Sequence, residues 1–269
     1  MDMKGWLRTG AIAARNVLVG GNLRALGLIG EPRRLVHYAS ESLFLYKTLS
    51  GARELPQQSV AAAFPGMGPR QITLAGLDDD AWSGPVASYT ADLVALCLLC
   101  RFLQPRTVFE IGTLNGFMAY HFALNSPDAR VFTLDLPKAG SDGATVLGVT
   151  PLDRMHIAAA RSAAEYCFAG TPEAGRIECL FGDSATFDYS PYHGRVDLFF
   201  IDGAHSYEYV ASDTGNALRC CRPGGIIAWH DYGRAGVNGV SRFLAELRRS
   251  GHDVRSVPGS SVAFLQIPG

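Results

Sequence analysis

The chain has 269 residues, of which 48% are hydrophobic and 18% are charged, and its formal net charge is −1. This composition argues against a disordered or fibrous protein, and the length suits one large domain or one domain with an appendage. A net charge so close to zero gives no general reason to expect a nucleic-acid or anionic-membrane partner.

Residues 1–84 are expected to form a mainly helical N-terminal extension. Residues 35–49 have its clearest helical pattern, and a Pro/Gly-rich loop or linker follows around 64–69. Residues 1–53 carry eight basic and three acidic side chains, so this segment is basic within a nearly neutral chain. Such a segment could contact a membrane surface or a partner protein, but we favour an amphipathic helix that packs on its own protein.

Targeting signals and a disulfide framework are not evident. No run of 18 apolar residues could span a bilayer, and residues 1–30 lack the cleavage site of a signal peptide. Cys97 and Cys100 are predicted to be buried thiols on a helix, because no second cysteine pair follows at zinc-ribbon spacing. We therefore expect a cytoplasmic, reducing location, and we leave open whether the protein forms a homo-oligomer.

From residue 85 onward, apolar runs alternate with helical periodicity, which predicts βαβ units. The predicted helices cover residues 86–103, 117–124, 153–168, 207–221 and 240–249. The predicted strands cover residues 107–111, 130–134, 177–181, 196–201, 226–229, 254–257 and 262–267. The expected fold of residues 85–269 is α/β: a Rossmann-like, doubly wound sheet of seven mostly parallel strands.

A carboxylate stands at or just after the end of each of the first five predicted strands. Ligands of doubly wound sheets bind beyond these carboxyl ends, near the point where the strand order reverses. One acid there would be an ordinary helix cap, but five together indicate a ligand site. In strand order they are Glu110, Asp135, Asp183, Asp202 and Asp231.

The turn after the first strand has two glycines. Gly112 allows the backbone to turn sharply beneath a ligand, and Gly116 allows the next helix to begin close to it. The three-glycine dinucleotide fingerprint is absent, and Glu110 would repel a pyrophosphate but would suit a cationic amino group. Asp135, at the end of the second strand, can accept hydrogen bonds from both hydroxyls of a ribose.

These residues resemble the class I S-adenosylmethionine-dependent methyltransferases, over roughly residues 85–267. The resemblance implies that S-adenosylmethionine is the cofactor and that the motif at 108–116 holds it. It further implies that Asp135 binds the ribose and that Asp183 contacts the adenine amine. The implied cofactor-binding set is Glu110, Gly112, Thr113, Gly116, Asp135, Asp183 and Ser184.

Residues 201–207 and 229–232 resemble one branch of that superfamily, which contains metal-dependent O-methyltransferases of natural-product sugars and cephalosporin-hydroxylase-type proteins. The resemblance implies a divalent cation (Mg²⁺, Mn²⁺ or Fe²⁺) on Asp202, His230 and Asp231. It also implies that His205 is a general base, with Asp202 as its catalytic neighbour. His230 stands where the metal-dependent members usually have an acid, so a metal-free His–Asp pair that orients substrate stays open.

The predicted activity is O-methylation of a hydroxylated small molecule, either a natural product or a sugar. The chain would align the acceptor, remove its proton through His205 and exclude water, with residues 1–84 covering the site. One alternative is an NAD-dependent oxidoreductase on a related sheet, which Glu110 and the missing third glycine disfavour. Another is a non-catalytic adenosylmethionine-binding or scaffold protein. Methylation of nucleic acid is disfavoured, because no Asn-Pro-Pro-Tyr-type motif follows the fourth strand.

Overall fold

The computed structural model describes residues 55–76, 87–137, 145–162, 165–234 and 237–269. The chain divides into two compact units, residues 1–52 and 53–269, and the described residues belong to the second unit. The predictions for residues 1–54, which include the helix at 35–49 and the basic surface, lie outside the described residues. Within the described part, no helix is long and apolar enough to cross a membrane.

The centre of this unit is a seven-stranded sheet with the strand order β3-β2-β1-β4-β5-β7-β6. The first five strands are parallel, and β7 pairs antiparallel with both β5 and β6. The order reverses between β1 and β4, which confirms the doubly wound, mostly parallel sheet. The strands are β1 (Thr107–Ile111), β2 (Arg130–Asp135), β3 (Ile177–Phe181), β4 (Val196–Ile201), β5 (Cys221–Trp229), β6 (Arg255–Ser256) and β7 (Ala263–Gln266).

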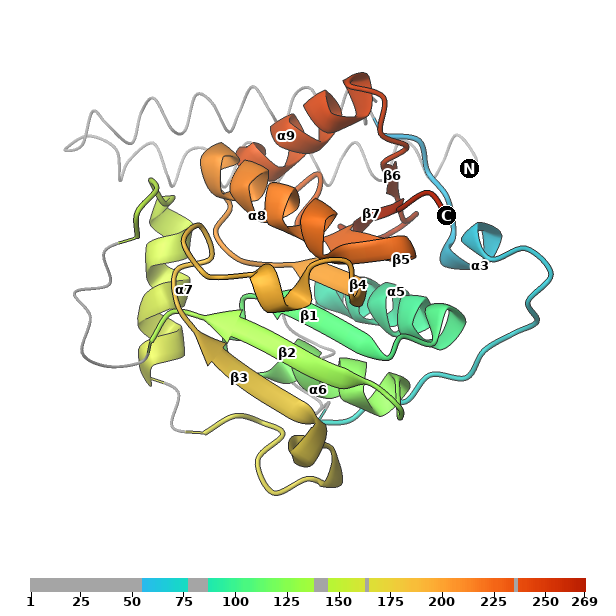
Figure 1. The fold of residues 1–269 in the computed structure, drawn as a ribbon, viewed down its shortest axis with the longest axis horizontal. Coiled ribbons are helices and arrows are strands. Elements are labelled where there is room, and N and C mark those ends of the chain that lie inside the picture. The colour runs from blue at the N-terminus through green and yellow to red at the C-terminus, as the bar shows by residue number, and fades with distance from the viewer. Residues whose placement is uncertain (1–54, 77–86, 138–144, 163–164, 235–236) are drawn as a thin grey trace. The chain divides into compact units, whose positions relative to one another are not determined.

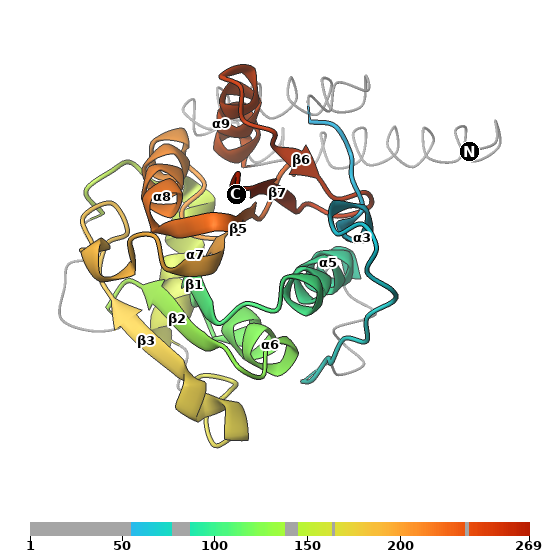
Figure 2. The same cartoon turned by 45° about the vertical axis from the view of Figure 1, so that its right-hand side comes forward.

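Helices cover both faces of the sheet (Figure 1, and turned by 45° in Figure 2). One face packs on α5 and α6, which also contact each other, and the other face packs on α8 and α9. The α-helices are α3 (Val60–Ala63), α5 (Ala87–Leu103), α6 (Phe117–Asn125), α7 (Pro151–Ser162), α8 (Tyr207–Cys220) and α9 (Asn238–Arg249). Two 3₁₀ turns precede β3 and β4, at Pro172–Arg176 and Ser190–Tyr192.

The core follows from the period of two along the central strands. Leu198 and Phe200 of β4 pack toward α5 and α6, whereas Phe199 and Ile201 pack toward α8 and α9. Every residue of β4 is buried, as its nearly unbroken apolar run predicts for a central parallel strand. Burial on both faces fixes the register of β4, and therefore the place at which its carboxyl end delivers Asp202.

Two predicted elements, β5 and α7, differ from the structure by more than two residues at one end. Strand β5 begins at Cys221 and not at 226, because a register shift against β4 accommodates the Pro-Gly-Gly sequence within the strand. Helix α7 begins earlier, at Pro151, and the chain has turned by Phe168, whose buried ring packs close to Gly116.

Residues 55–76 pack on the sheet, although the sequence places them in the extension. Gln57 forms a parallel bridge with Ser256, and the backbone N–H of Leu55 donates to the hydroxyl of Tyr232 at 3.1 Å. The predicted boundary between residues 84 and 85 falls in 77–86, outside the described residues. The predicted thiols Cys97 and Cys100 are buried in α5, as expected.

Candidate active site

A cavity of about 570 Å³ lies at the carboxyl ends of the parallel strands, where the strand order reverses. The turns after the first five strands form one side of it, and residues of α5, α6 and α7 line it together with Gly76, Thr145 and Val149. Among the predicted site residues, all but Gly116 line this cavity. Those lining it are Glu110, Gly112, Thr113, Asp135, Asp183, Ser184, Asp202, His205, His230 and Asp231.

Both predicted glycines are required by the backbone. Gly112 has φ 99°, and a Cβ there would lie 2.1 Å from the carbonyl oxygen of Asp202. Gly116 caps α6 with φ 80°, and a Cβ there would lie 2.4 Å from the ring of Phe168. Any side chain would therefore push the β1 turn away from the end of β4. The need for Gly112 comes from the close approach of two backbones, and the resulting turn faces the cavity.

Glu110 is buried at the end of β1 and is tied to β2 through hydroxyl groups. The hydroxyl of Thr133 donates to Glu110 Oε2 at 2.5 Å, and the Oγ1 atoms of Thr113 and Thr133 lie 2.6 Å apart. Burial raises the pKa of Glu110 well above its ordinary value, against the hydrogen bond from Thr133. A ligand ammonium placed against this carboxyl group would favour its charged form.

The next two acids are held by backbone amides. Asp135 accepts from the N–H of Leu114 at 2.9 Å and from the N–H of Leu136 at 2.7 Å. Oδ2 of Asp183 accepts from the N–H of Val146 and from the hydroxyl of Tyr209, and Oδ1 accepts from the N–H of Ala185. An ionised carboxylate has about four acceptor positions, so Asp183 can accept one further donor.

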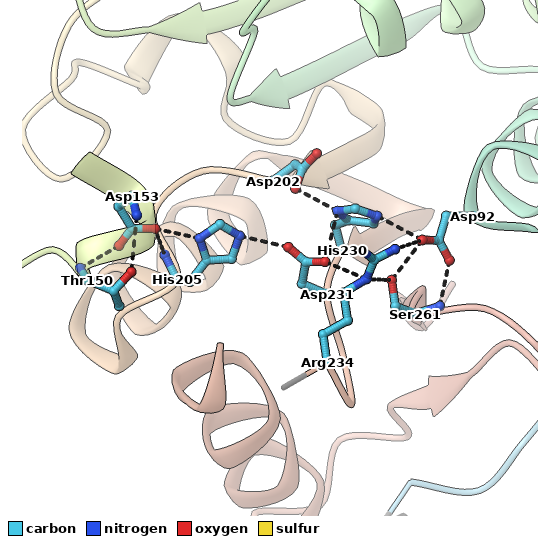
Figure 3. A network of polar contacts seen from close by, with 9 residues as sticks. All are labelled: Asp92, Thr150, Asp153, Asp202, His205, His230, Asp231, Arg234 and Ser261. Atoms are coloured by element: carbon cyan, nitrogen blue, oxygen red, sulfur yellow. Dashed lines mark hydrogen bonds and ion pairs between the residues drawn. The ribbon is translucent and has the colours of Figure 1, made fainter. Parts of the chain in front are cut away.

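The ends of β4 and β5 carry a network of alternating carboxylates and cations (Figure 3). His205 Nδ1 lies 2.5 Å from Oδ1 of Asp153, and Nε2 lies 2.8 Å from Oδ2 of Asp231. Burial would lower the pKa of His205, but its hydrogen bonds and charge interactions with these two carboxylates raise it to about 10. The imidazole is therefore protonated at neutral pH, with one N–H directed at each carboxylate.

His230 continues the same network. Its Nδ1 lies 2.9 Å from Oδ1 of Asp202, and its Nε2 lies 3.0 Å from Oδ2 of Asp92. The guanidinium of Arg234 bridges Asp92 and Asp231, with N–O distances of 2.6 and 2.8 Å. Convergence of Asp202, His205, His230 and Asp231, which the sequence predicts, is confirmed by these distances.

Three members of the network were missed in the sequence: Asp92, Asp153 and Arg234. Asp92 lies in the apolar sequence of α5, and its signal was a single acid on an otherwise hydrophobic helix face. Asp153 stands three residues after Thr150, a spacing typical of a helix cap.

Asp231 has φ 61°, a backbone conformation that is costly for a residue other than glycine and that persists where the surroundings impose it.

The donor types at this end fit a divalent cation. Asp202, His205 and Asp231 each offer one ligand atom, and these atoms lie within 4.8 Å of one another. Two carboxylates and one imidazole suit Mn²⁺ or Fe²⁺ better than Mg²⁺. This set contains His205 where the sequence predicted His230, whose two ring nitrogens face Asp92 and Asp202.

The strand order, the antiparallel β7 and the cavity at the β1/β4 reversal are those of the class I methyltransferase fold. Residues 109–232 match the family model Methyltransf_24, which is described as a methyltransferase domain. Residues 109–232 therefore match a methyltransferase domain, on a sheet with the class I methyltransferase fold. The match favours a methyltransferase over the NAD-dependent oxidoreductase that the sequence left as an alternative.

The solved structure of one methyltransferase agrees with the fold. The chain is similar to the SAH-bound methyltransferase PaMTH1 of Podospora anserina, with a TM-score of 0.51 and 19% identity over 73% of this chain and 91% of that chain. It is also similar to the O-methyltransferase TomG of Streptomyces achromogenes, with a TM-score of 0.46 and 22% identity over 72% of this chain and 92% of that chain. Among proteins with curated descriptions, none matches this sequence.

Proposed function

We propose that this methyltransferase transfers the methyl group of S-adenosylmethionine to a hydroxyl group of a small molecule. The observation that carries the proposal is that one cavity reaches both the predicted donor-binding turns and the carboxylate–histidine network. Its volume of about 570 Å³ lies within the range of small-molecule sites. When bound, S-adenosylmethionine supplies an electrophilic methyl group on a sulfonium.

In the proposal, the turns after β1, β2 and β3 hold the donor. Glu110 receives its amino group, and the backbone from Gly112 to Thr113 passes beneath it. Asp135 accepts the ribose hydroxyls. Asp183 and Ser184 face the adenine, and Asp183 uses its remaining acceptor position for the exocyclic amine.

Asp202 and His205 act on the acceptor. Asp202 has a partly exposed side chain in the cavity wall, and it orients the acceptor hydroxyl by accepting its hydrogen bond. His205 removes the proton in its neutral form. Because the pKa of His205 is raised to about 10, the neutral form becomes more abundant as the pH rises.

A divalent cation on Asp202, His205 and Asp231 would supply a Lewis acid that lowers the pKa of the acceptor hydroxyl. His205 cannot be both a ligand and a base, because the same Nε2 lone pair would serve both purposes. Chelation therefore separates the two assignments.

The charges of the residues that line the cavity limit which class of acceptor can bind. Among the described residues, seven carboxyl side chains and no lysine or arginine line the cavity. Arg234 pairs with Asp92 and Asp231 and is not one of the lining residues. A phosphorylated or carboxylated acceptor would find no lysine or arginine there, and the imidazoles of His205 and His230 already face carboxylates. A neutral or cationic hydroxylated compound therefore fits best.

The test is methyl transfer by the full chain. Formation of S-adenosylhomocysteine is measured with labelled donor against a panel of neutral, cationic and phosphorylated hydroxyl compounds, with product analysis to locate the methyl group. We expect an O-methylated product from a neutral or cationic member. A product methylated on nitrogen or carbon alone, or donor that does not bind in calorimetry, would contradict the proposal.

A further inference from the structure

We infer that Asp153, in the first turn of α7, is a positioning residue that fixes the His205 ring in the active site. The inference rests on the proposed function, which assigns His205 to the acceptor. Asp153 comes from an element outside the strand ends, 52 residues before His205 in the chain.

Two polar contacts join the Asp153 carboxylate to His205, and two more join Asp153 to Thr150. Oδ1 of Asp153 lies 2.5 Å from Nδ1 of His205 and also accepts the backbone N–H of His205 at 3.1 Å. Its Oδ2 accepts the backbone N–H of Thr150 at 2.6 Å, and the Thr150 hydroxyl accepts the backbone N–H of Asp153 at 3.2 Å. The reciprocal bonds form a helix cap, so the carboxylate that orients the ring is itself fixed by the start of α7.

This contact determines how the ring of His205 is presented. With Asp153 on Nδ1 and Asp231 on Nε2, rotation of the ring is blocked at both nitrogens. The side chains of His205 and Asp153 are only 6% and 2% exposed, so water cannot easily replace the carboxylate. Without Asp153, the ring would keep one anchor and Nε2 would lose its defined direction toward the β4 and β5 ends.

The same segment also reaches the donor end of the cavity. The N–H of Val146 donates to Asp183 at 2.9 Å, and Thr145, Val149, His156 and Ile157 line the cavity with Asp153. Residues 145–157 therefore contact both the predicted adenine acid and the predicted base. Within this segment, Asp153 is the residue that binds the predicted base His205.

The experiment compares three variants of the full chain. Asp153→Ala removes the carboxylate, Asp153→Asn keeps an acceptor for Nδ1–H, and Thr150→Ala removes only the hydroxyl of the helix cap. The readouts are kcat, KM for the acceptor, donor affinity by calorimetry, and the ¹⁵N and proton NMR signals of the His205 ring. The ring signals are assigned by their absence from His205→Gln.

We expect Asp153→Ala to lower kcat by about 10–100-fold, as for other partners that orient a functional histidine, with unchanged donor affinity. The strongly deshielded Nδ1 proton of His205 should disappear in this variant. Asp153→Asn should recover part of kcat, and Thr150→Ala should retain both kcat and the Nδ1 signal. This pattern separates orientation of the ring from stabilisation of α7.

An unchanged Nδ1 signal in Asp153→Ala would overturn the inference, as would an equal loss of kcat in Thr150→Ala. Failure of the proposed function looks different, because the wild-type chain would then methylate no hydroxyl compound. In that case the NMR comparison still decides whether Asp153 holds the ring: loss of the signal supports it and persistence overturns it.

Discussion

The two ends of the cavity are built in different ways. At the donor end, the carboxylates of Asp135 and Asp183 accept hydrogen bonds from neutral donors, which include four backbone N–H groups and the hydroxyl of Tyr209. At the acceptor end, the side chains bind one another: each imidazole lies between two carboxylates, and Arg234 bridges Asp92 and Asp231. Hydrogen bonds from backbone N–H groups fix the positions of the donor-end acids. The network of ion pairs at the acceptor end also sets the balance of positive and negative charge there.

The positive and negative charges of the acceptor end nearly cancel within the protein. The acceptor end has four carboxylates, which are opposed by one guanidinium and two imidazoles with raised pKa values. Buried charges of this kind are favourable only as a set, and removal of one member leaves its partners unpaired. Substitutions at the donor end should therefore change affinity alone, whereas substitutions at the acceptor end should change turnover.

The largest effect is expected for His205→Ala. Loss of a general base lowers kcat by about 10²–10⁴-fold, while donor affinity should stay the same because the donor end is held by separate contacts. Steady-state turnover and calorimetry with S-adenosylhomocysteine measure the two quantities. His193→Ala, which changes an exposed histidine outside the cavity, is the matched control. A parallel loss of donor affinity in His205→Ala would mean that the two ends are not independent.

The next largest effect is expected at Asp135, where donor affinity should change and kcat should not. Asp135→Ala should weaken donor binding by about 2–3 kcal/mol, because two charge-assisted hydrogen bonds to the ribose are lost. At saturating donor, kcat should be close to that of the wild type. Asp128→Ala serves as the control, since Asp128 is an exposed acid just before the other end of β2. Unchanged affinity in Asp135→Ala would remove the assignment of the ribose site.

The sequence allowed the donor end to be predicted more fully than the acceptor end, for physical reasons. The bounds of β1, β3 and β4 match the prediction, because short apolar runs between turn residues are a local signal of strands. The glycine turn is equally local, and Leu136 and Ala185 support Asp135 and Asp183 from nearby in the chain. Their other partners, Leu114, Val146 and Tyr209, are more distant in the chain.

Asp92 and Asp153 could not be found in this way, because their partners are remote in the chain. Asp92 binds Ser261 and His230, which are 169 and 138 residues away. Asp153 has a local explanation as a helix cap, which is correct and hides its contact with His205. Only the packing of α5 and α7 beside the strand ends brings these acids into the network.

The pH dependence of turnover tests the charge balance directly. The pKa of His205 is raised to about 10, so a neutral base is scarce at pH 7 and its fraction grows about tenfold per pH unit until that pKa. We therefore expect kcat to rise between pH 7 and 9, with donor affinity nearly constant. The profile is recorded with chelator and again with added Mn²⁺.

Two results would contradict the base assignment. One is a flat profile between pH 7 and 9 in the presence of chelator. The other is activity that is lost on chelation and restored by Mn²⁺, which would make His205 a ligand and leave proton removal to another group. Turnover that is insensitive to chelation but rises with pH agrees with the metal-free base.

The smallest effect concerns Asp213, a buried acid of α8 beneath the donor end. Burial raises its pKa to about 7 from 3.8, an increase that the Ser184 side chain offsets only in part. Between these values the folded protein keeps a proton that the unfolded chain has lost, so the free energy of unfolding falls as the pH rises from about 4 to 7 and then levels. Asp213→Asn removes the ionisation and should flatten this fall.

At pH 8 the Asp213→Asn variant should be more stable than the wild type by about 1 kcal/mol, less than the full ionisation penalty because the buried amide brings donors that also need partners. Denaturant unfolding at pH 5 and pH 8 measures the difference, with Asp128→Asn as an exposed control that should change neither value. A variant that keeps the wild-type pH dependence would show that Asp213 is already ionised without penalty. The donor end would then also contain a buried charge that its surroundings stabilise. The two ends of the cavity would differ only in how many such charges they hold.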